Sequence, residues 1–210
     1  MSIHNVYVVD DDQAVRDSLR WLIESVGLKV KTFSNGQELL DNFNDSEISC
    51  LVLDVRMPGI SGLDLQQRLK NQNSKVPVII VTGHADVPMA IQAMKAGAFD
   101  FIEKPYSDQL LLERIQCAIE QDDCFKKQQT INDDINHRID SLTPRENEVM
   151  ALVVTGHSNK SIAKELGVSI KTVEVHRGNL MSKMKAKSLS ELVRIALTTD
   201  RPLKQTSDNN

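Results

Sequence analysis

The chain has 210 residues, of which 40% are hydrophobic and 26% are charged, and its formal net charge is −4. These values are ordinary for a soluble globular protein and allow one large domain or two small ones. No apolar run approaches the length of a membrane span, no signal-peptide pattern opens the chain, and the three cysteines lack Cys-x-x-Cys spacing, so we expect a cytoplasmic protein with reduced thiols.

The first 120 residues alternate between strand and helix patterns. Short apolar runs bounded by turn residues predict strands buried on both faces, as in a parallel sheet, and residues 29–33 instead alternate between polar and apolar side chains like a strand. The expected strands are residues 6–9, 29–33, 50–54, 78–82 and 99–102, and the expected helices are 13–26, 36–43, 62–69, 86–97 and 107–118. Five strand–helix units imply an α/β fold with a doubly wound parallel sheet.

The next stretch, residues 121–140, is polar, contains neither Gly nor Pro and has few apolar anchors. We interpret it as a linker, with a helix extension at its start. It divides a first domain, residues 1–120, from a second domain, residues 141–200. A polar tail of residues 201–210, expected to be disordered, follows.

The second domain is predicted to be all helical. Thr143, Pro144 and Glu146 supply an N-cap, a proline at the first helical position and a capping-box glutamate, and Gly156 closes that helix. Three further helices are expected at residues 160–166, 170–184 and 188–197, the last opening with a second capping box, Ser188 and Glu191. Two helices joined by a short turn containing Gly have the helix-turn-helix layout.

The two halves differ in charge. Residues 1–118 carry 11 Lys and Arg against 16 Asp and Glu, whereas residues 160–194 carry 8 against 3. A basic segment behind an acidic domain indicates that the second half faces a polyanion.

Four predicted strands end in side chains that suit metal and phosphate chemistry. These are Asp10, Asp11 and Asp12 after the first strand, Asp54 at the third, Thr82 at the fourth and Lys104 after the fifth. The carboxyl ends of parallel strands meet at one edge of a sheet, where open α/β sheets bind ligands. Taken alone, the first aspartates would be a helix cap and solvated turn residues. Their occurrence together with the other groups instead favours a site for a divalent metal and a phosphoryl group.

These motifs resemble the receiver domain of two-component response regulators. The resemblance covers residues 4–120 and rests on Val9-Asp10-Asp11, Leu53-Asp54-Val55-Arg56-Met57-Pro58-Gly59, Thr82-Gly83-His84 and Phe101-Ile102-Glu103-Lys104-Pro105. Residues 141–197 are similar to the LuxR-type helix-turn-helix through Ile162-Ala163-x-x-Leu166-Gly167-Val168-Ser169-x-x-Thr172-Val173. The whole chain looks like the NarL/FixJ group, which implies a flavodoxin-like five-stranded sheet followed by a four-helix DNA-binding domain.

The resemblance implies specific roles at the acidic edge. Asp54 would accept the phosphoryl group from a sensor histidine kinase. Asp10 and Asp11, with Asp54 and the backbone carbonyl of Arg56, would bind Mg²⁺. A carboxylate nucleophile of this kind attacks phosphorus while metal and lysine neutralise the developing charge.

The resemblance also implies a switch. Thr82 and Lys104 would contact the phosphoryl oxygens, and Phe101 would change rotamer when Thr82 moves inward. The peptide bond between Lys104 and Pro105 would be cis. The surface around residues 89–104 would rearrange and bind a second copy of the chain, giving a homodimer on phosphorylation.

The helix expected at residues 170–184 is the candidate DNA-reading element. Val173, Leu180 and Met184 share one face, while Lys171, Glu174, Val175, Gly178 and Ser182 share another. An exposed Val fits a thymine methyl group, and a Glu can accept from cytosine N4. The DNA-binding residues we expect are Lys171, Thr172, Glu174, Val175, Arg177, Gly178 and Lys183, with Lys160, Lys164, Lys185 and Lys187 as further phosphate contacts. Some relatives carry a lysine at the position of Gly178, so the target sequence stays open.

The sequence thus predicts a transcription regulator, not an enzyme beyond phosphorylation and dephosphorylation of Asp54. Its expected partners are a histidine kinase, double-stranded DNA, a second copy and RNA polymerase. An aspartyl-phosphate phosphatase is disfavoured because that class uses Asp-x-Asp, whereas Arg56 stands two residues after Asp54. A receiver that acts without phosphate, and a helical protein-interaction domain in the second half, are the remaining alternatives. His84 lies close to Thr82 in the sequence, so a catalytic role is an alternative, but we expect it to be a solvent-facing loop residue.

Overall fold

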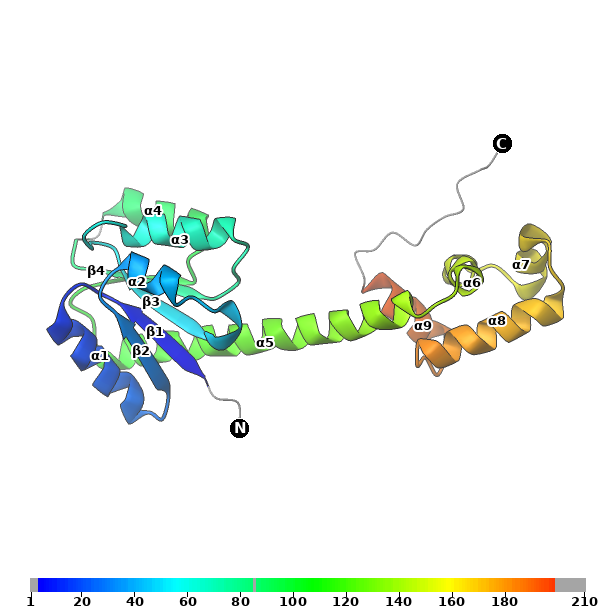
Figure 1. Cartoon of the computed structure of the whole chain (residues 1–210), viewed down its shortest axis with the longest axis horizontal. Coiled ribbons are helices and arrows are strands. Elements are labelled where there is room, and N and C mark those ends of the chain that lie inside the picture. Colours follow the sequence, from blue (N-terminus) through cyan, green and yellow to red (C-terminus); the bar gives the residue numbers. More distant parts are fainter. Residues whose placement is uncertain (1–3, 85, 199–210) are drawn as a thin grey trace. The chain divides into compact units, whose positions relative to one another are not determined.

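The computed structural model describes residues 4–84 and 86–198 and divides into two compact units, Met1–Lys126 and Lys127–Asn210 (Figure 1). The predicted polar tail, together with residues 199–200, lies outside the described residues.

The first unit is built on one parallel sheet. Its strands are β1 (Asn5–Val9), β2 (Lys29–Phe33), β3 (Cys50–Asp54), β4 (Val78–Thr82) and β5 (Asp100–Glu103). They are ordered β2-β1-β3-β4-β5, so the chain first adds β2 on one side of β1 and then turns to the other side. The predicted doubly wound parallel sheet is therefore confirmed, with its topological switch between β1 and β3.

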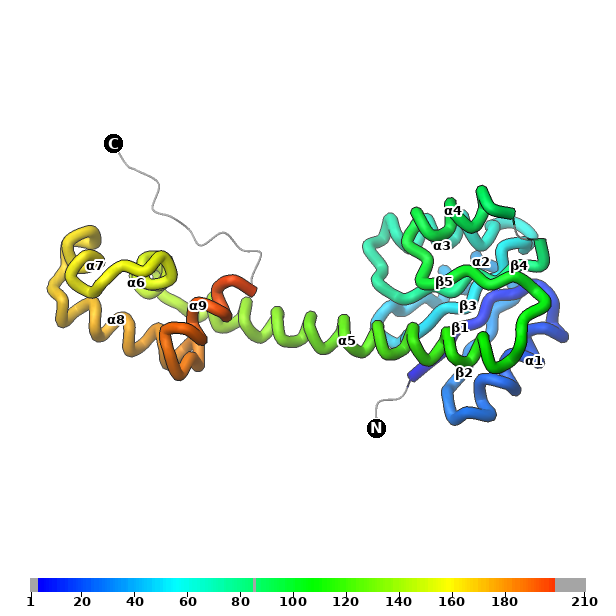
Figure 2. Tube along the Cα trace, turned by 180° about the vertical axis from the view of Figure 1, so that it is seen from behind, coloured from blue at the N-terminus to red at the C-terminus, as the bar shows by residue number. Residues whose placement is uncertain are grey.

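Helices cover both faces of this sheet (Figures 1 and 2). They are α1 (Gln13–Ser25), α2 (Gly36–Asp41), α3 (Gly62–Asn71), α4 (Val87–Ala96) and α5 (Asp108–Asp140). Helices α2, α3 and α4 pack on one face, and α1 and the first part of α5 pack on the other. A short 3-10 helix, Asp45–Glu47, was not predicted.

Side chains of the central strands enter two separate cores. Along β3, Leu51 and Leu53 belong to the core under α2, α3 and α4, whereas Cys50 and Val52 belong to the core under α1 and α5. This alternation is what period-two strands produce when both faces are covered. The prediction of strands buried on both faces is confirmed for β1, β3 and β4, whereas the edge strand β5 is only partly buried. The site at the carboxyl ends of the central strands therefore rests on a rigid support.

Helix α5 runs through the stretch interpreted as a linker, so the helix extension expected at its start continues to Asp140. Within the first unit, Asp122 is buried, and the Lys126 ammonium lies 2.8 Å from its carboxylate and donates to the carbonyl of Ile48 at 2.9 Å. A polar composition without Gly or Pro is compatible with helix when side-chain pairs four residues apart support it. In the described part of the chain, no helix is long and apolar enough to span a membrane.

The second unit contains four further described helices. These are α6 (Pro144–Val154), α7 (Asn159–Leu166), α8 (Ile170–Lys183) and α9 (Leu189–Leu197). The Thr143–Glu146 capping box is present with both hydrogen bonds. At α9, Ser188 caps the helix as predicted, but the Glu191 carboxylate accepts from the backbone N–H of Lys187 instead of Ser188. The all-helical second domain is confirmed.

Candidate functional site

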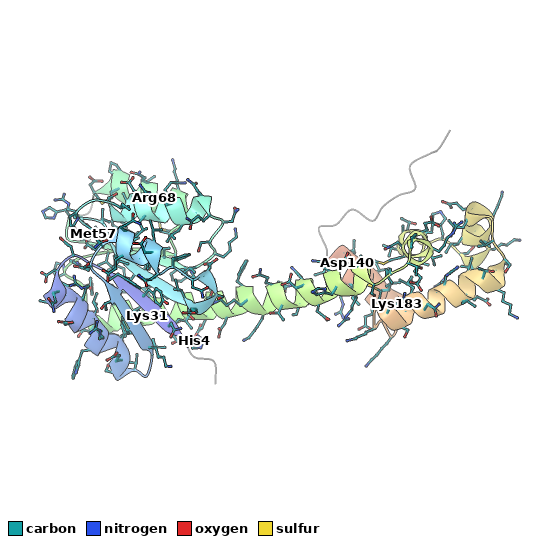
Figure 3. The ribbon with its side chains drawn as sticks, viewed as in Figure 1. His4, Lys31, Met57, Arg68, Asp140 and Lys183 are labelled. Atoms are coloured by element: carbon teal, nitrogen blue, oxygen red, sulfur yellow. The ribbon has the colours of Figure 1, made fainter. Side chains whose placement is uncertain are left out.

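Three charged side chains meet at the carboxyl ends of the strands. Asp10 follows β1, Asp54 ends β3, and Lys104 follows β5. The Lys104 ammonium donates to Asp10 Oδ2 and to Asp54 Oδ1, at 2.9 Å each. Met57, labelled in Figure 3, marks this end of the sheet. Residues 94 and 50 positions apart in the chain therefore form one ion-paired group.

Backbone N–H groups donate hydrogen bonds to the other carboxylate oxygen of Asp10 and of Asp54. The N–H of Arg56 donates to Asp54 Oδ2 at 2.6 Å, and the N–H of Asp12 donates to Asp10 Oδ1 at 2.9 Å. The Arg16 guanidinium donates to the carbonyl of Asp10 at 2.7 Å. Because Asp10 and Asp54 are only 4% and 8% exposed, these bonds fix both carboxylates in orientation.

Burial and charge act in opposite directions on this group. Burial raises the pKa of Asp54, and the nearby Asp10 carboxylate raises it further, against the lowering effect of the Lys104 hydrogen bond. Burial would lower the pKa of Lys104, but its bonds to Asp54 and Asp10 outweigh that effect and raise the pKa. Two carboxylates with one ammonium leave a net negative charge at a partly desolvated site, which an additional cation would offset.

The donor set suits a hard divalent cation. Asp10, Asp11 and Asp54 offer carboxylate oxygens, and the backbone of Arg56 lies against Asp54, so the ligands are of the kind Mg²⁺ prefers. Asp11 is exposed, which leaves it open to an arriving ion. No three His, Cys, Asp or Glu side chains in residues 4–84 and 86–198 stand close enough together to hold a metal ion by themselves. A metal here would therefore combine carboxylates with a backbone oxygen and water.

Thr82 and Phe101 occupy the neighbouring strands. Thr82 is fully buried at the end of β4, where its hydroxyl accepts from the backbone N–H of His84 at 3.3 Å and its carbonyl accepts from that of Lys104 at 2.8 Å. Phe101, on β5, is half-buried against the core under α4. His84 is exposed, as expected of a loop residue, and the peptide bond between Lys104 and Pro105 is cis.

Gly62 packs directly against the backbone at the end of β3, a role that was not predicted from the sequence. It begins α3, and its N–H donates to the carbonyl of Val55 at 3.0 Å. A Cβ at this position would lie 2.1 Å from the backbone oxygen of Asp54. Only glycine lets α3 start this close to the end of β3. Its position three residues after Gly59, directly behind the N-cap Ser61, was the available sequence indication.

In the second unit, α8 presents the two faces that its sequence predicts. Val173, Leu180 and Met184 are fully buried in the core. Lys171, Glu174, Val175, Gly178 and Ser182 are exposed along the opposite side. Val175 is 58% exposed although it is apolar, and nothing lies within 4 Å of a Cβ built at Gly178. This stripe therefore combines an apolar residue and a carboxylate on an exposed side of the helix.

Two of the expected DNA-binding cations are engaged within the unit. The Arg177 guanidinium donates to Asn159 Oδ1 at 2.6 Å. The Lys183 ammonium, labelled in Figure 3, donates to Glu146 at 2.7 Å and to the carbonyl of Ser141 at 3.0 Å. The Thr172 hydroxyl lies 2.8 Å from that of Ser169, the N-cap of α8. Lys171 is exposed and so differs from Arg177 and Lys183.

Two known families match this chain, one in each of the two compact units. Residues 6–116 match the response regulator receiver domain, and residues 140–196 match the bacterial regulatory proteins of the luxR family.

Several characterised proteins are similar over nearly the whole chain. The transcriptional regulatory protein FixJ of Bradyrhizobium diazoefficiens is 48% identical over 92% of this chain and 94% of its own length. The response regulator protein TodT of Pseudomonas putida is 43% identical over 90% of this chain and 84% of its own length. Among solved structures, the response regulator StyR, at 39% identity, covers 94% of this chain over its full length with a TM-score of 0.87. Full-length FixJ from B. japonicum, at 47% identity, covers 94% of this chain over 98% of its own with a TM-score of 0.57.

Proposed function

The chain belongs to the two-component response regulators that join a receiver domain to a LuxR-type DNA-binding domain, and we propose that phosphorylation of Asp54 switches its binding to DNA. Membership makes it a transcription regulator and implies a kinase partner and a DNA target. The proposed place of action is the cytoplasm, and RNA polymerase is a further proposed partner. The observation that carries the proposal is the bridging of Asp10 and Asp54 by Lys104 at the carboxyl edge of the sheet.

Asp54 is the proposed nucleophile. One of its carboxylate oxygens attacks phosphorus of a phosphohistidine, the phosphorus–nitrogen bond breaks, and the electron pair leaves with the imidazole. Lys104, already within hydrogen-bonding distance of Asp54 Oδ1, neutralises charge that develops on the transferred group. The neighbouring backbone N–H of Arg56 holds the second carboxylate oxygen, so the nucleophile is oriented before the donor arrives.

Receiver domains generally bind Mg²⁺, and here the proposed ligands are Asp10, Asp11, Asp54 and the carbonyl of Arg56. A bound Mg²⁺ would supply charge neutralisation at the phosphoryl oxygens. Asp10 and Asp54 are held in fixed orientation by backbone N–H groups, and Asp11, next to Asp10 in the chain, is exposed.

The proposed switch passes from Thr82 to α4. A phosphoryl oxygen on Asp54 offers the buried Thr82 hydroxyl a stronger acceptor and draws it inward. Phe101 then turns into the space that Thr82 leaves, and the surface of α4 and β5 rearranges. On α4, Val87, Ile91 and Met94 are 72%, 48% and 48% exposed, an apolar stripe suited to a second copy of the chain. Phosphorylation would therefore favour a homodimer.

DNA is the proposed target of the exposed side of α8. Glu174, Val175 and Gly178 would face base edges, and Lys171 would contact phosphate together with the exposed Lys160 and Lys164. Thr172 and Arg177 lie beside this stripe and are proposed to contact the backbone of the duplex. Lys183 is proposed to act mainly within the domain, through Glu146.

One experiment tests the chemistry and the switch together. The protein is incubated with Mg²⁺ and acetyl phosphate, followed by intact mass and by selection of bound fragments from a random DNA pool. We expect one added phosphoryl group and tighter binding to the selected sites. Asp54→Asn should lose the added mass, Asp11→Asn should raise the Mg²⁺ concentration needed for labelling, and the exposed Asp17→Asn is the matched control. Labelling of Asp54→Asn equal to that of the unchanged protein would falsify the assignment. Labelling without any change in DNA binding would instead support a receiver that acts independently of phosphate.

A further inference from the structure

The last turns of α5 belong to the second unit and meet the end of α8. Ile135 and Ile139 are buried in the core of that unit, and Arg138 lies between them along the helix. Nη1 of Arg138 donates to the backbone carbonyl of Met184 at 3.2 Å, and its Nη2 pairs with Asp134 one turn earlier. Arg138 stands two residues before the segment that matches the luxR family, so the family match does not include it.

The carbonyl that Arg138 contacts lies where α8 ends. Met184 is the C-cap of α8, and Lys185 then takes a positive φ of 53°, which turns the chain out of the helix. The N–H of Ala186 donates back to the carbonyl of Met181 at 3.0 Å, as in a Schellman motif. The last carbonyls of a helix lack partners within the helix and carry partial negative charge. At Met184, a guanidinium from another helix meets this charge.

A second hydrogen bond joins the same two helix ends in the opposite direction. The Lys183 ammonium, in the last turn of α8 and labelled in Figure 3, donates to the carbonyl of Ser141, directly after α5, at 3.0 Å. We call the Arg138–Met184 and Lys183–Ser141 bonds the α5–α8 clamp. Apolar packing has no direction and decides only which side of α8 is buried. Hydrogen bonds are directional, so the clamp fixes the position of the end of α8.

Stability alone does not explain a guanidinium at this position. The Arg138 side chain is mostly buried, and its Nε has no hydrogen-bond partner among the residues that the structure describes. A buried N–H without a partner lowers stability, and an ion pair with the exposed Asp134 contributes little. An apolar side chain of similar length would fill the same space without that cost. This points to a role for Arg138 in the placement of α8.

We propose that Arg138 is a positioning residue for sequence-specific DNA binding, because it holds the end of α8 while Glu174 and Val175 face base edges. The inference rests on the proposed function of α8 and adds a residue from outside the family match. When one end of a helix tilts in the major groove, the residues that read bases shift with it. A shift of about 1 Å is enough to break hydrogen bonds to base edges. Flexible lysine side chains keep their phosphate contacts after such a shift.

Arg138→Met tests this role in the full chain, treated with Mg²⁺ and acetyl phosphate. We expect the ratio of affinities for selected and random DNA to fall about tenfold, as the loss of one base contact does, with unchanged affinity for random DNA. Arg138→Lys should restore the ratio to within about threefold of the unchanged protein, because an ammonium can also donate to the Met184 carbonyl. The matched control is Arg145→Met, since the ion pair of Arg145 with Glu148 stays within α6. It should leave the ratio as it is.

Hydrogen exchange without DNA follows the clamp itself. Amides in the last turn of α8 should exchange faster in Arg138→Met than in Arg145→Met, because the end of the helix has lost its contact with α5. If Arg138→Met does not fold, Arg138→Gln replaces it, since its shorter side chain does not reach Met184. Failure of both variants to fold would show that Arg138 acts through stability, and the inference would be wrong.

The DNA measurements separate this inference from the proposed function. If Arg138→Met weakens binding to every DNA alike and lowers the salt slope by about one, Arg138 contacts phosphate and is not a positioning residue. An unaltered ratio in Arg138→Met overturns the inference and leaves the proposed function standing. If the unchanged protein shows no preference for any DNA sequence, both are overturned.

Discussion

At the scale of single residues, the receiver site depends on how closely backbone and side chains approach one another. Asp54 is held by Lys104 on one oxygen and by the N–H of Arg56 on the other, while Gly62 closes the space beneath it. Arg56 is a local partner, two residues after Asp54, whereas Lys104 is 50 residues away and lies beyond the reach of local sequence rules. Small substitutions at Lys104 or Gly62 should therefore change the position or orientation of the Asp54 carboxylate.

Gly62→Ala should lower the free energy of unfolding by about 1–3 kcal/mol, because the new methyl group must displace the start of α3 from the Asp54 carbonyl. Phosphodonor labelling of the folded fraction should also slow, since Asp54 moves with its backbone. Gly83→Ala is the matched control, because its Cβ meets nothing within 4 Å and its backbone does not have a positive φ. Urea denaturation and a labelling time course measure both effects. Equal stability of the two variants would show that α3 can shift freely.

Lys183 and Glu146 form the corresponding pair in the second unit. Glu146 is 3% exposed; its burial would raise the pKa of its carboxyl, but the Lys183 ammonium and the backbone and side chain of Thr143 outweigh this and lower the pKa. Because the folded pKa is depressed, the pair stabilises the fold above the ordinary pKa of Glu, about 4.3, and this contribution is lost as pH falls through the folded value.

Lys183→Ala should cost about 1–2 kcal/mol of unfolding free energy at pH 7, since Glu146 keeps its bond to the Thr143 N–H. The difference from the unchanged protein should shrink at a pH below about 4. The exposed Lys187→Ala should have no such effect. Urea denaturation at both pH values is the measurement. If Lys183→Ala is as stable as the unchanged protein but lowers the salt dependence of DNA binding, the Lys183 ammonium contacts a DNA phosphate and does not mainly stabilise the domain.

At the scale of elements, the position of each residue on α8 determines whether we expect it to affect the affinity for DNA or the preference for one DNA sequence. One side is fixed in the core by Val173 and Leu180, so the residues on the exposed side cannot change which way they point. Glu174 and Val175 lie in the middle of that side, and Lys171 lies at its N-terminal end. This order suits the proposal that Glu174 and Val175 face base edges while Lys171 contacts phosphate.

Lys171→Ala should weaken binding to all DNA sequences alike and reduce the slope of log K against log salt by about one. Glu174→Ala should relax the preference at one base pair, costing about 1–3 kcal/mol against the correct site, without weakening non-specific binding. Competition binding at two salt concentrations distinguishes the two. A Glu174→Ala protein that keeps its preferred sequence but binds every DNA less tightly would show that α8 does not enter the major groove.

At the scale of the whole molecule, two independent cores support two activities. The core of the second unit includes Ile135 and Ile139, which belong to α5 and lie before the predicted start of that domain at residue 141. We therefore propose that an autonomous DNA-binding fragment begins near Lys127, where the second unit starts. In the full chain, the acidic first unit is proposed to limit DNA binding until it is phosphorylated.

A fragment of residues 127–210 should bind DNA without a phosphodonor, more weakly than the phosphorylated full chain because receiver-driven dimerisation is absent. A fragment beginning at Ile139 lacks Ile135 and should be about 2–4 kcal/mol less stable, or unfolded. Circular dichroism and DNA titration of both fragments measure this. The switch fails if the full chain binds equally well with and without phosphate.

The sequence by itself determined the local features. Apolar runs predicted four strands, alternation predicted β2, cap residues marked the starts of several helices, and the period of α8 predicted its buried and exposed sides. Such features depend on neighbours within a few residues, so local rules reach them. Family resemblance then gave roles to the residues at the strand ends, and those roles remain proposals that the labelling experiment tests.

Only the tertiary structure decided the partners. Lys104 pairs with Asp10 and Asp54, and Lys183 pairs with Glu146. These partners are too far apart along the chain for any sequence periodicity to predict the pairs. In the polar stretch after residue 120, Lys126 bonds to the carbonyl of Ile48 and Asp122 is buried, and the contact with Ile48 spans 78 residues of the chain. Pairs of this kind form only where the fold brings two chain segments within hydrogen-bonding distance of about 3 Å. Tertiary packing sets that distance, and the spacing of the residues along the chain does not.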